Sequence, residues 1–231
     1  EVKSLRALPE FEPSSSTSLC GVVPLVVILN KEYVALAEKL AWVRRHCAAA
    51  AFTVHHHAPL FSQTTGVPFH KISFGVDLAR FASERAPRYE LDLGFTGVIR
   101  GDQTNNWRAK IWGHSWAKLR AHGLRLYSGP QGGVRSGVAH NELNSSMYVA
   151  MMRASRMWLS TTGPVDLVGT RYFEVMATGT TLCLCNRVRD ASVYGSLGLE
   201  DRVHVVMFDT LDEFESLAFN FTRPENERAR L

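Results

Sequence analysis

The chain has 231 residues, of which 45% are hydrophobic and 21% are charged, and its net charge is +4. This composition is typical of folded domains and excludes an intrinsically disordered chain, while the length allows one large domain or two modest ones. The 26 basic residues are spread along the chain. This spread argues against nucleic-acid binding, because little charge is gathered to hold a phosphate backbone.

Residues 1–20 are polar and rich in Pro and Ser, and we expect them to form a flexible segment. From Val22 onward, short β-branched runs alternate with longer stretches of helical periodicity, a pattern that predicts an α/β fold with Rossmann-like parallel sheets. Strands are predicted at 22–29, 51–54, 71–74, 93–99, 124–127, 157–160, 181–185 and 203–208. Helices are predicted at 32–46, 78–82, 107–121, 145–154, 170–177 and 211–221.

The boundary between two units is predicted near Gly75-Val76-Asp77. Residues 21–77 contain three predicted strands, which is few for an independent doubly wound domain, whereas residues 78–231 contain five to six. We therefore expect a partial amino-terminal α/β domain at 21–77 and a complete Rossmann-like domain at 78–231. Because the chain begins with Glu1 rather than Met, we expect it to be truncated.

The four cysteines form no CxxC pair, and Cys183 and Cys185 lie in an apolar run. The other two are Cys20 and Cys47. We interpret all four as small buried residues of a protein in a reducing compartment, which predicts a cytoplasmic protein. The longest apolar run, 21–29, is too short to span a bilayer, and no signal peptide is visible. A secretory lumen remains the alternative if an amino-terminal anchor was removed.

Segment 160–185 contains the most informative group of polar residues. It predicts a strand end, a glycine-containing loop, a helix from Thr170 and a further strand, and open parallel sheets bind ligands where such strands end. Asp166 and Glu174 could both accept hydroxyl groups of a sugar there, although a helix cap and a solvated face are the plain alternatives. Arg171 in the first helical turn opposes the helix dipole unless an anion binds beside it.

Two stretches of the chain, considered together, resemble sequence motifs of one known protein family. Residues 174–179 are Glu-Val-Met-Ala-Thr-Gly, and residues 74–77 are Phe-Gly-Val-Asp, followed by Phe81. Together with Asp166 and Gly169 they resemble the glycosyltransferases of the two-Rossmann-domain architecture called GT-B, particularly the group 1 and spore-coat-like members. Asp166 replaces the usual first glutamate of that family, and Phe74 replaces the usual asparagine.

The resemblance implies a metal-independent hexosyl- or pentosyltransferase that moves a sugar from a nucleoside-diphosphate donor to a hydroxyl acceptor, without a prosthetic group. In that family the glutamate equivalent to Glu174 binds the ribose, and Asp166 with the backbone at Gly169 and Thr170 would hold the transferred sugar. A cation after the first strand of the second unit offsets the charge on the diphosphate. The implied donor-binding residues are Arg108, Lys110, Asp166, Gly169, Thr170, Arg171 and Glu174.

His55, His56 and His57 follow the predicted strand at 51–54, so they are expected at a strand tip. Three adjacent histidines could bind a metal, contact a donor or acceptor, or be incidental loop residues; because consecutive residues rarely converge on one ion, no metal is expected. His55 and Glu32 are the candidates for a catalytic base. The competing functions are a non-catalytic nucleotide- or carbohydrate-binding module, a fragment of a larger GT-B enzyme, and an epimerase or phosphorylase of the same architecture.

Overall fold

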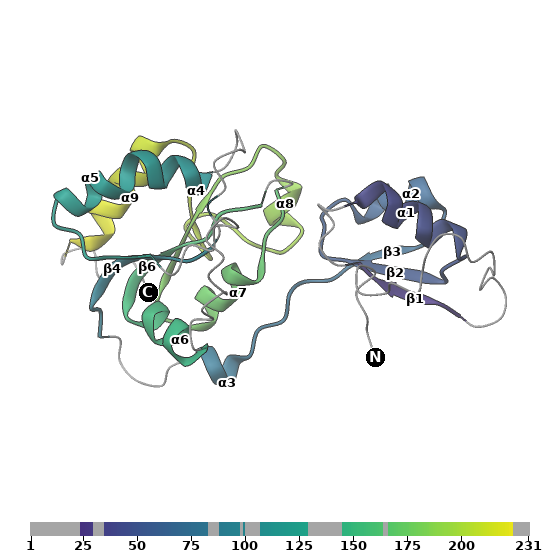
Figure 1. Ribbon diagram of the computed structural model, residues 1–231, viewed down its shortest axis with the longest axis horizontal. Coiled ribbons are helices and arrows are strands. Elements are labelled where there is room, and N and C mark those ends of the chain that lie inside the picture. The colour runs from purple at the N-terminus through teal and green to yellow at the C-terminus, as the bar shows by residue number, and fades with distance from the viewer. Residues whose placement is uncertain are drawn as a thin grey trace, which may run out of the picture. The chain divides into compact units, whose positions relative to one another are not determined.

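The computed structural model describes residues 24–29, 35–82, 88–97, 99, 107–128, 145–163 and 166–223. The chain divides into two compact units, Glu1–Phe74 and Gly75–Leu231. Both units are α/β, and each is built on a parallel sheet, one with three strands and one with five. The general Rossmann-like class expected from the alternation of strands and helices is thus confirmed (Figure 1).

The first unit contains a three-stranded sheet in the order β1-β2-β3, formed by β1 (Val26–Ile28), β2 (Ala50–Thr53) and β3 (Phe69–Lys71). Two helices, α1 (Leu36–Arg45) and α2 (Ala58–Thr65), cover one face of this sheet (Figure 1). Val43 of α1 and Phe61 of α2 are buried against Val27 and Ala51. The predicted amphipathic first helix therefore packs on the sheet through its apolar side.

The second unit contains a five-stranded sheet in the order β5-β4-β6-β7-β8. The strands are β4 (Leu91–Phe95), β5 (Leu126–Ser128), β6 (Ser155–Leu159), β7 (Leu182–Asn186) and β8 (Val206–Phe208). Every neighbouring pair is parallel. The central strands β6 and β7 each contain a run of buried apolar residues, Met157–Leu159 and Cys183–Cys185, as expected of strands covered on both faces.

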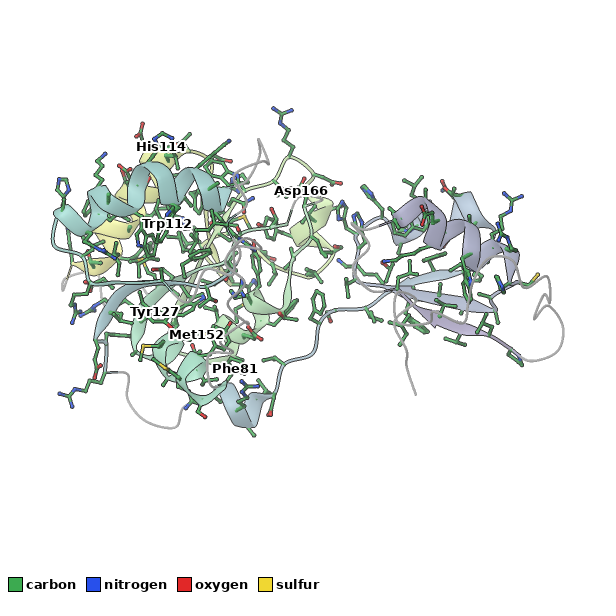
Figure 2. The ribbon with its side chains drawn as sticks, in the orientation of Figure 1. Phe81, Trp112, His114, Tyr127, Met152 and Asp166 are labelled. Carbon is green, nitrogen blue, oxygen red and sulfur yellow. The ribbon has the colours of Figure 1, made fainter. Side chains whose placement is uncertain are left out.

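Helices cover both faces of the five-stranded sheet (Figure 1). The continuous helical stretch of α4 (Trp107–Lys110), the π-helical η2 (Ile111–Ser115) and α5 (Trp116–Ala121) packs with α9 (Leu211–Thr222) on one face. On the other lie α3 (Leu78–Phe81), α6 (Ser145–Arg153), α7 (Thr170–Ala177) and α8 (Ser192–Gly195). Figure 2 shows Trp112 on the first side, and Tyr127, Met152 and Phe81 on the second.

Two helices were missed by the sequence prediction. The helix α2 directly follows the three histidines; it is short, contains Pro59 in its first turn, and ends at Gly66 with a φ of 73°. The other, α8, is a single turn. Both are held by the residues that they bury, Phe61 in α2 and Tyr194 in α8, so local periodicity gave little signal for them.

The described cysteines differ from the prediction at one position, and Cys20 lies outside the described residues. Cys183 and Cys185 are buried free thiols in β7, and burial raises the pKa of the Cys183 thiol to about 12. Cys47, in contrast, is disulfide-bonded, so the expected free thiol is wrong there. Within the described ranges, no helix is long and apolar enough to cross a bilayer.

Candidate functional site

In the sheet of the second unit, the order of the strands reverses between β4 and β6. The strand β5 lies on one side of β4, and β6, β7 and β8 follow on the other side. Strands β4 and β6 are neighbours, but the helical stretch that follows β4 packs on one face of the sheet, and α7, which follows β6, packs on the other. Loops that diverge in this way leave space at the carboxyl edge of the sheet, where open α/β folds bind their ligands. The candidate site therefore consists of residues at this edge.

Two arginines meet at the end of β4. Arg108 of α4 donates from Nε to Oγ1 of Thr161 at 2.8 Å, which ties it to the chain just after β6. Gly97, just after β4, has a φ of +134°, and a Cβ there would lie 3.0 Å from Nη1 of Arg171 and 3.1 Å from Nη1 of Arg108. The missing side chain of Gly97 is thus what allows both guanidinium groups to approach the backbone at this point.

The two guanidinium groups repel each other electrostatically at this point. Burial, followed by the neighbouring Arg171 guanidinium, lowers the pKa of Arg108 to about 10. Arg171 forms no ion pair with a residue that the structure describes, and its buried Nε has no hydrogen-bond partner among them. Two guanidinium groups held this close together favour the binding of an anion.

The amino terminus of α7 adds to this positive field. Gly169 is the N-cap residue, with extended backbone and no side chain that caps the helix, so the first N–H groups are left for an external acceptor. A Cβ at Gly169 would meet nothing within 4 Å, so the backbone there is open to close approach. Thr170, the first residue of the helix, is exposed.

Asp166 lies in the tight turn before α7. It has a positive φ of 53°, and its N–H donates to the carbonyl of Gly163 at 3.0 Å. The side chain is exposed (Figure 2). It therefore carries a solvated carboxylate on the same connection as Gly169 and Thr170.

Glu174 lies one helical turn after Arg171, on the same side of α7. Its Oε2 accepts a hydrogen bond of 2.6 Å from the hydroxyl of Tyr148 in α6. Burial raises the pKa of Tyr148 to about 12, while Arg171 and Glu174 act on it in opposite directions. Arg171, Tyr148 and Glu174 therefore form one polar group, next to Arg108.

Lys110, the second predicted cation, differs from Arg108. It is exposed, and its Nζ lies 5.0 Å from the centre of the Trp107 ring. Side chains two positions apart on a helix point in different directions. The Arg108 side chain therefore reaches Gly97, whereas the Lys110 side chain lies over Trp107. The structure thus joins Arg108, Arg171 and Glu174 through contacts, but shows none that joins Lys110 to them.

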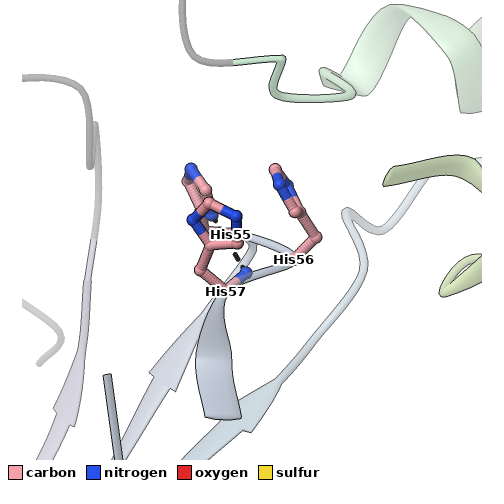
Figure 3. A group of neighbouring side chains, drawn as sticks. All are labelled: His55, His56 and His57. Atoms are coloured by element: carbon pink, nitrogen blue, oxygen red, sulfur yellow. Dashed lines mark hydrogen bonds between the residues drawn. The ribbon is translucent and has the colours of Figure 1, made fainter. Parts of the chain in front are cut away.

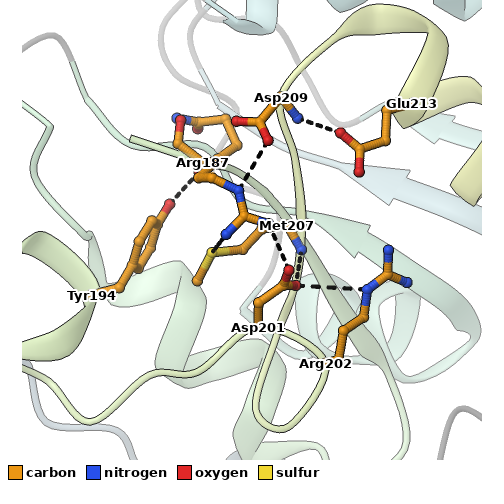
Figure 4. Close-up of polar contacts among 8 residues, drawn as sticks. Arg187, Tyr194, Asp201, Arg202, Met207, Asp209 and Glu213 are labelled. Carbon is orange, nitrogen blue, oxygen red and sulfur yellow. Dashed lines mark hydrogen bonds and ion pairs between the residues drawn. The ribbon is translucent and has the colours of Figure 1, made fainter. Parts of the chain in front are cut away.

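A second charged cluster in this unit is compensated internally. Arg187, just after β7, pairs with Asp201 at 2.6 Å and with Asp209 at 3.0 Å (Figure 4). Asp201 also accepts from the backbone N–H of Met207 in β8. These contacts connect the ends of β7 and β8, and they contrast with Arg171, which has no carboxylate partner among the described residues.

The first unit has its own polar group at a strand tip. His55, His56 and His57 follow β2, and His55 is 4% exposed. Their rings lie against one another, with centroids 4.1 to 4.7 Å apart (Figure 3). Burial, then the other two histidines and Lys71, lowers the pKa of His55 to about 4, so His55 is neutral at pH 7.

A hydrogen bond assigns the tautomer of His55. Its Nδ1 accepts from the backbone N–H of His57 at 3.1 Å, so the neutral ring carries its proton on Nε2. In this state His55 offers a hydrogen-bond donor, and it could accept a proton at Nε2 only after exchanging tautomers. Glu32, the other candidate base, lies outside the described residues.

The same hydrogen bond bears on metal binding. One ligand nitrogen from each of the three histidines lies within 4.8 Å of the others, so the group could hold a metal ion. A metal on Nδ1 of His55 would displace the His57 N–H, and a metal on Nε2 would require a proton on Nδ1 facing that N–H. The positive charge of Lys71 beside His55 also opposes a cation.

Three residues at the second-unit site were not predicted: Gly97, Thr161 and Tyr148. Gly97 could have been found, because a glycine after the first strand of a Rossmann-like unit commonly allows close backbone approach. Tyr148 carried no such signal, since its neighbour Glu174 is 26 positions away. A comparison with known proteins finds no protein-family model that matches the chain, and no curated protein that matches it.

Proposed function

We propose that this chain is a glycosyltransferase of GT-B type that transfers a sugar from a nucleoside-diphosphate donor to a hydroxyl acceptor. The observation that carries the proposal is the convergence of the Arg108 and Arg171 guanidinium groups on Gly97, at the carboxyl edge between β4 and β6. A diphosphate is the anion that suits two adjacent guanidinium groups. Each of them can donate two parallel hydrogen bonds to phosphate oxygens.

The proposed reaction uses these cations in its bond-breaking step. When the bond between the anomeric carbon and the diphosphate oxygen breaks, negative charge grows on the leaving diphosphate. The acceptor oxygen bonds to the anomeric carbon, and its proton passes to an oxygen of the leaving diphosphate or to water. Positive groups held in place before the reaction lower the energy of that charge. Arg108, Arg171 and the open amino terminus of α7 would serve this purpose without a bound metal.

In this proposal, the remaining residues bind different parts of the nucleotide-sugar donor. Glu174 binds the ribose hydroxyls through the carboxylate oxygens that Tyr148 leaves available, and Asp166 with the backbone of Gly169 and Thr170 holds the transferred sugar. In the first unit, His55 would donate from Nε2 to an oxygen of a bound acceptor.

Calorimetric titration of the full chain with UDP, GDP and ADP tests the donor site. We expect one of them to bind, and we expect Arg171→Gln to weaken that binding about ten- to a hundredfold, because a charge-assisted hydrogen bond is worth about 1.5–3 kcal/mol. Arg120→Gln is the matched control, since Arg120 is an exposed arginine of α5. Equal affinities for the parent and for Arg171→Gln would refute the assignment.

A turnover assay separates catalysis from binding. Release of the free nucleoside diphosphate from UDP- and GDP-sugars, in the presence of mixed hydroxyl acceptors, should be faster with the parent than with Arg171→Gln. Tight binding without any release would instead identify a non-catalytic nucleotide-binding module or a fragment that needs further chain. Formation of an epimerised sugar nucleotide would identify an epimerase.

A further inference from the structure

We infer that Tyr148 is a positioning residue that holds the Glu174 carboxylate for both hydroxyls of a ribose, so that the site selects ribonucleoside diphosphates over 2′-deoxyribonucleoside diphosphates. This inference rests on the proposed function. It adds a residue that positions Glu174 and for which the sequence carried no signal, and it predicts how strongly the site discriminates against a 2′-deoxyribose.

The geometry gives Glu174 one fixed oxygen and one open oxygen. Oε2 accepts the Tyr148 hydroxyl at 2.6 Å, a short distance typical of a hydrogen bond to a charged acceptor. No described residue donates to Oε1, and no ion pair to Glu174 occurs among the described residues. A carboxylate has about four lone-pair sites, so three remain after Tyr148 has donated, enough for two vicinal hydroxyls.

Tyr148 is itself held in place by packing. Its ring lies edge-on to Trp158, with centroids 6.0 Å apart, and edge-on to Phe81 at 6.2 Å. Trp158 is fully buried in β6. A glutamate on a helix surface is otherwise free to change rotamer, and a hydrogen bond from a rigid neighbour removes that freedom before the ligand arrives.

The same arrangement explains why one missing hydroxyl should matter. A ribose donates to both carboxylate oxygens, whereas a 2′-deoxyribose leaves one oxygen of a half-buried carboxylate without its donor. A site built to hydrogen-bond a hydroxyl rejects the analogue that lacks it, because the protein group is left unpaired. The phosphates are bound by Arg108 and Arg171, so their contribution is the same for both ligands.

The chain offers a closely matched control in Tyr127 of β5. Its ring also lies 6.0 Å from Trp158, but its hydroxyl has no hydrogen-bond partner among the described residues. Tyr148→Phe and Tyr127→Phe therefore each remove one hydroxyl from a tyrosine beside the same tryptophan. Only the first removes a hydrogen bond to Glu174.

The experiment compares UDP, GDP and ADP, each with its 2′-deoxy analogue, and inorganic pyrophosphate, by calorimetry on the parent and both variants. We expect the parent to prefer the ribonucleotide about tenfold or more, and Tyr148→Phe to reduce that preference about threefold or more. Pyrophosphate affinity should change less than about twofold in either variant. Tyr127→Phe should keep the full preference.

The outcomes distinguish the two proposals. If the parent binds neither UDP nor GDP nor ADP, the proposed function fails. If it binds a nucleotide and Tyr148→Phe keeps the whole preference, or if the parent shows no preference, the function survives and the role of Tyr148 is refuted. An equal loss of affinity for pyrophosphate and nucleotide would show that Tyr148 acts through Arg171 or the fold, and would also overturn the inference.

Discussion

Replacing Gly94 by alanine is the most direct test of the sheet that carries the site. Gly94 of β4 is the register partner of Trp158 in β6. A Cβ at Gly94 would lie 2.2 Å from both Cε3 and Cζ3 of Trp158, and 2.9 Å from Oγ of Ser155. Carbon atoms normally pack about 3.5–4.0 Å apart, so the indole ring or the strand would have to move by more than about 1 Å.

That movement has no empty space to enter. Trp158 is 0% exposed and packs against both Tyr127 and Tyr148. Overpacking of a well-filled core costs about 1–3 kcal/mol and occasionally more, and we expect about 3 kcal/mol here because the clash involves a rigid ring and the β4–β6 backbone. For a domain of this size, that loss lowers the Tm by about 6–12 °C.

Differential scanning calorimetry and urea denaturation followed by circular dichroism measure this loss. Gly113→Ala is the control, because a Cβ there meets nothing within 4 Å and alanine favours the helical backbone by up to about 1 kcal/mol. Trp158→Phe should recover part of the stability lost in Gly94→Ala. A Gly94→Ala variant within about 0.5 kcal/mol of the parent would show that the register between β4 and β6 is wrong.

Two further predictions concern the histidines and the cysteines. Because the pKa of His55 in the folded chain, about 4, lies below its ordinary value of 6.5, the unfolded chain binds a proton between these pH values that the folded chain does not, and stability falls as the pH is lowered through this window. After allowance for solvent screening, His55→Gln should reduce this loss by roughly 1–2 kcal/mol in urea titrations at pH 7 and pH 4; an unchanged pH dependence would contradict the assignment. Alkylation in denaturant without reductant, read by mass spectrometry, should label Cys183 and Cys185 but not Cys47, and labelling of Cys47 would exclude its disulfide.

The fold could be predicted to a large extent because its signals are local. Each of the eight predicted strands overlaps an observed one, since β-branched and apolar runs of this length suit a sheet covered on both faces. Helix ends were also visible, and Gly123 and Gly179 have the positive φ values of helix-terminating glycines. The exceptions were α2 and α8, which depend on burial rather than on periodicity.

The candidate site could be predicted only where its residues are close in sequence. Arg171 and Glu174 lie on one helix, so their spacing alone places them on the same side of it. The contacts of Arg108 with Thr161 and of Tyr148 with Glu174 join positions 53 and 26 apart, and no periodicity links such pairs. The choice between Arg108 and Lys110 was likewise open until the direction of each side chain on α4 was known.

The sequence by itself determined the order of the strands and of the longer helices, the parallel α/β class and the chemical types of residue available at the strand ends. These properties follow from periodicity and from the backbone preferences of single residues. Only the tertiary structure decided that Gly97 lies against two guanidinium groups and that Tyr148 holds Glu174, because both depend on which strands become neighbours. The pairing of β4 with β6 brings these residues to one edge of the sheet, and the sheet order cannot be deduced from local patterns.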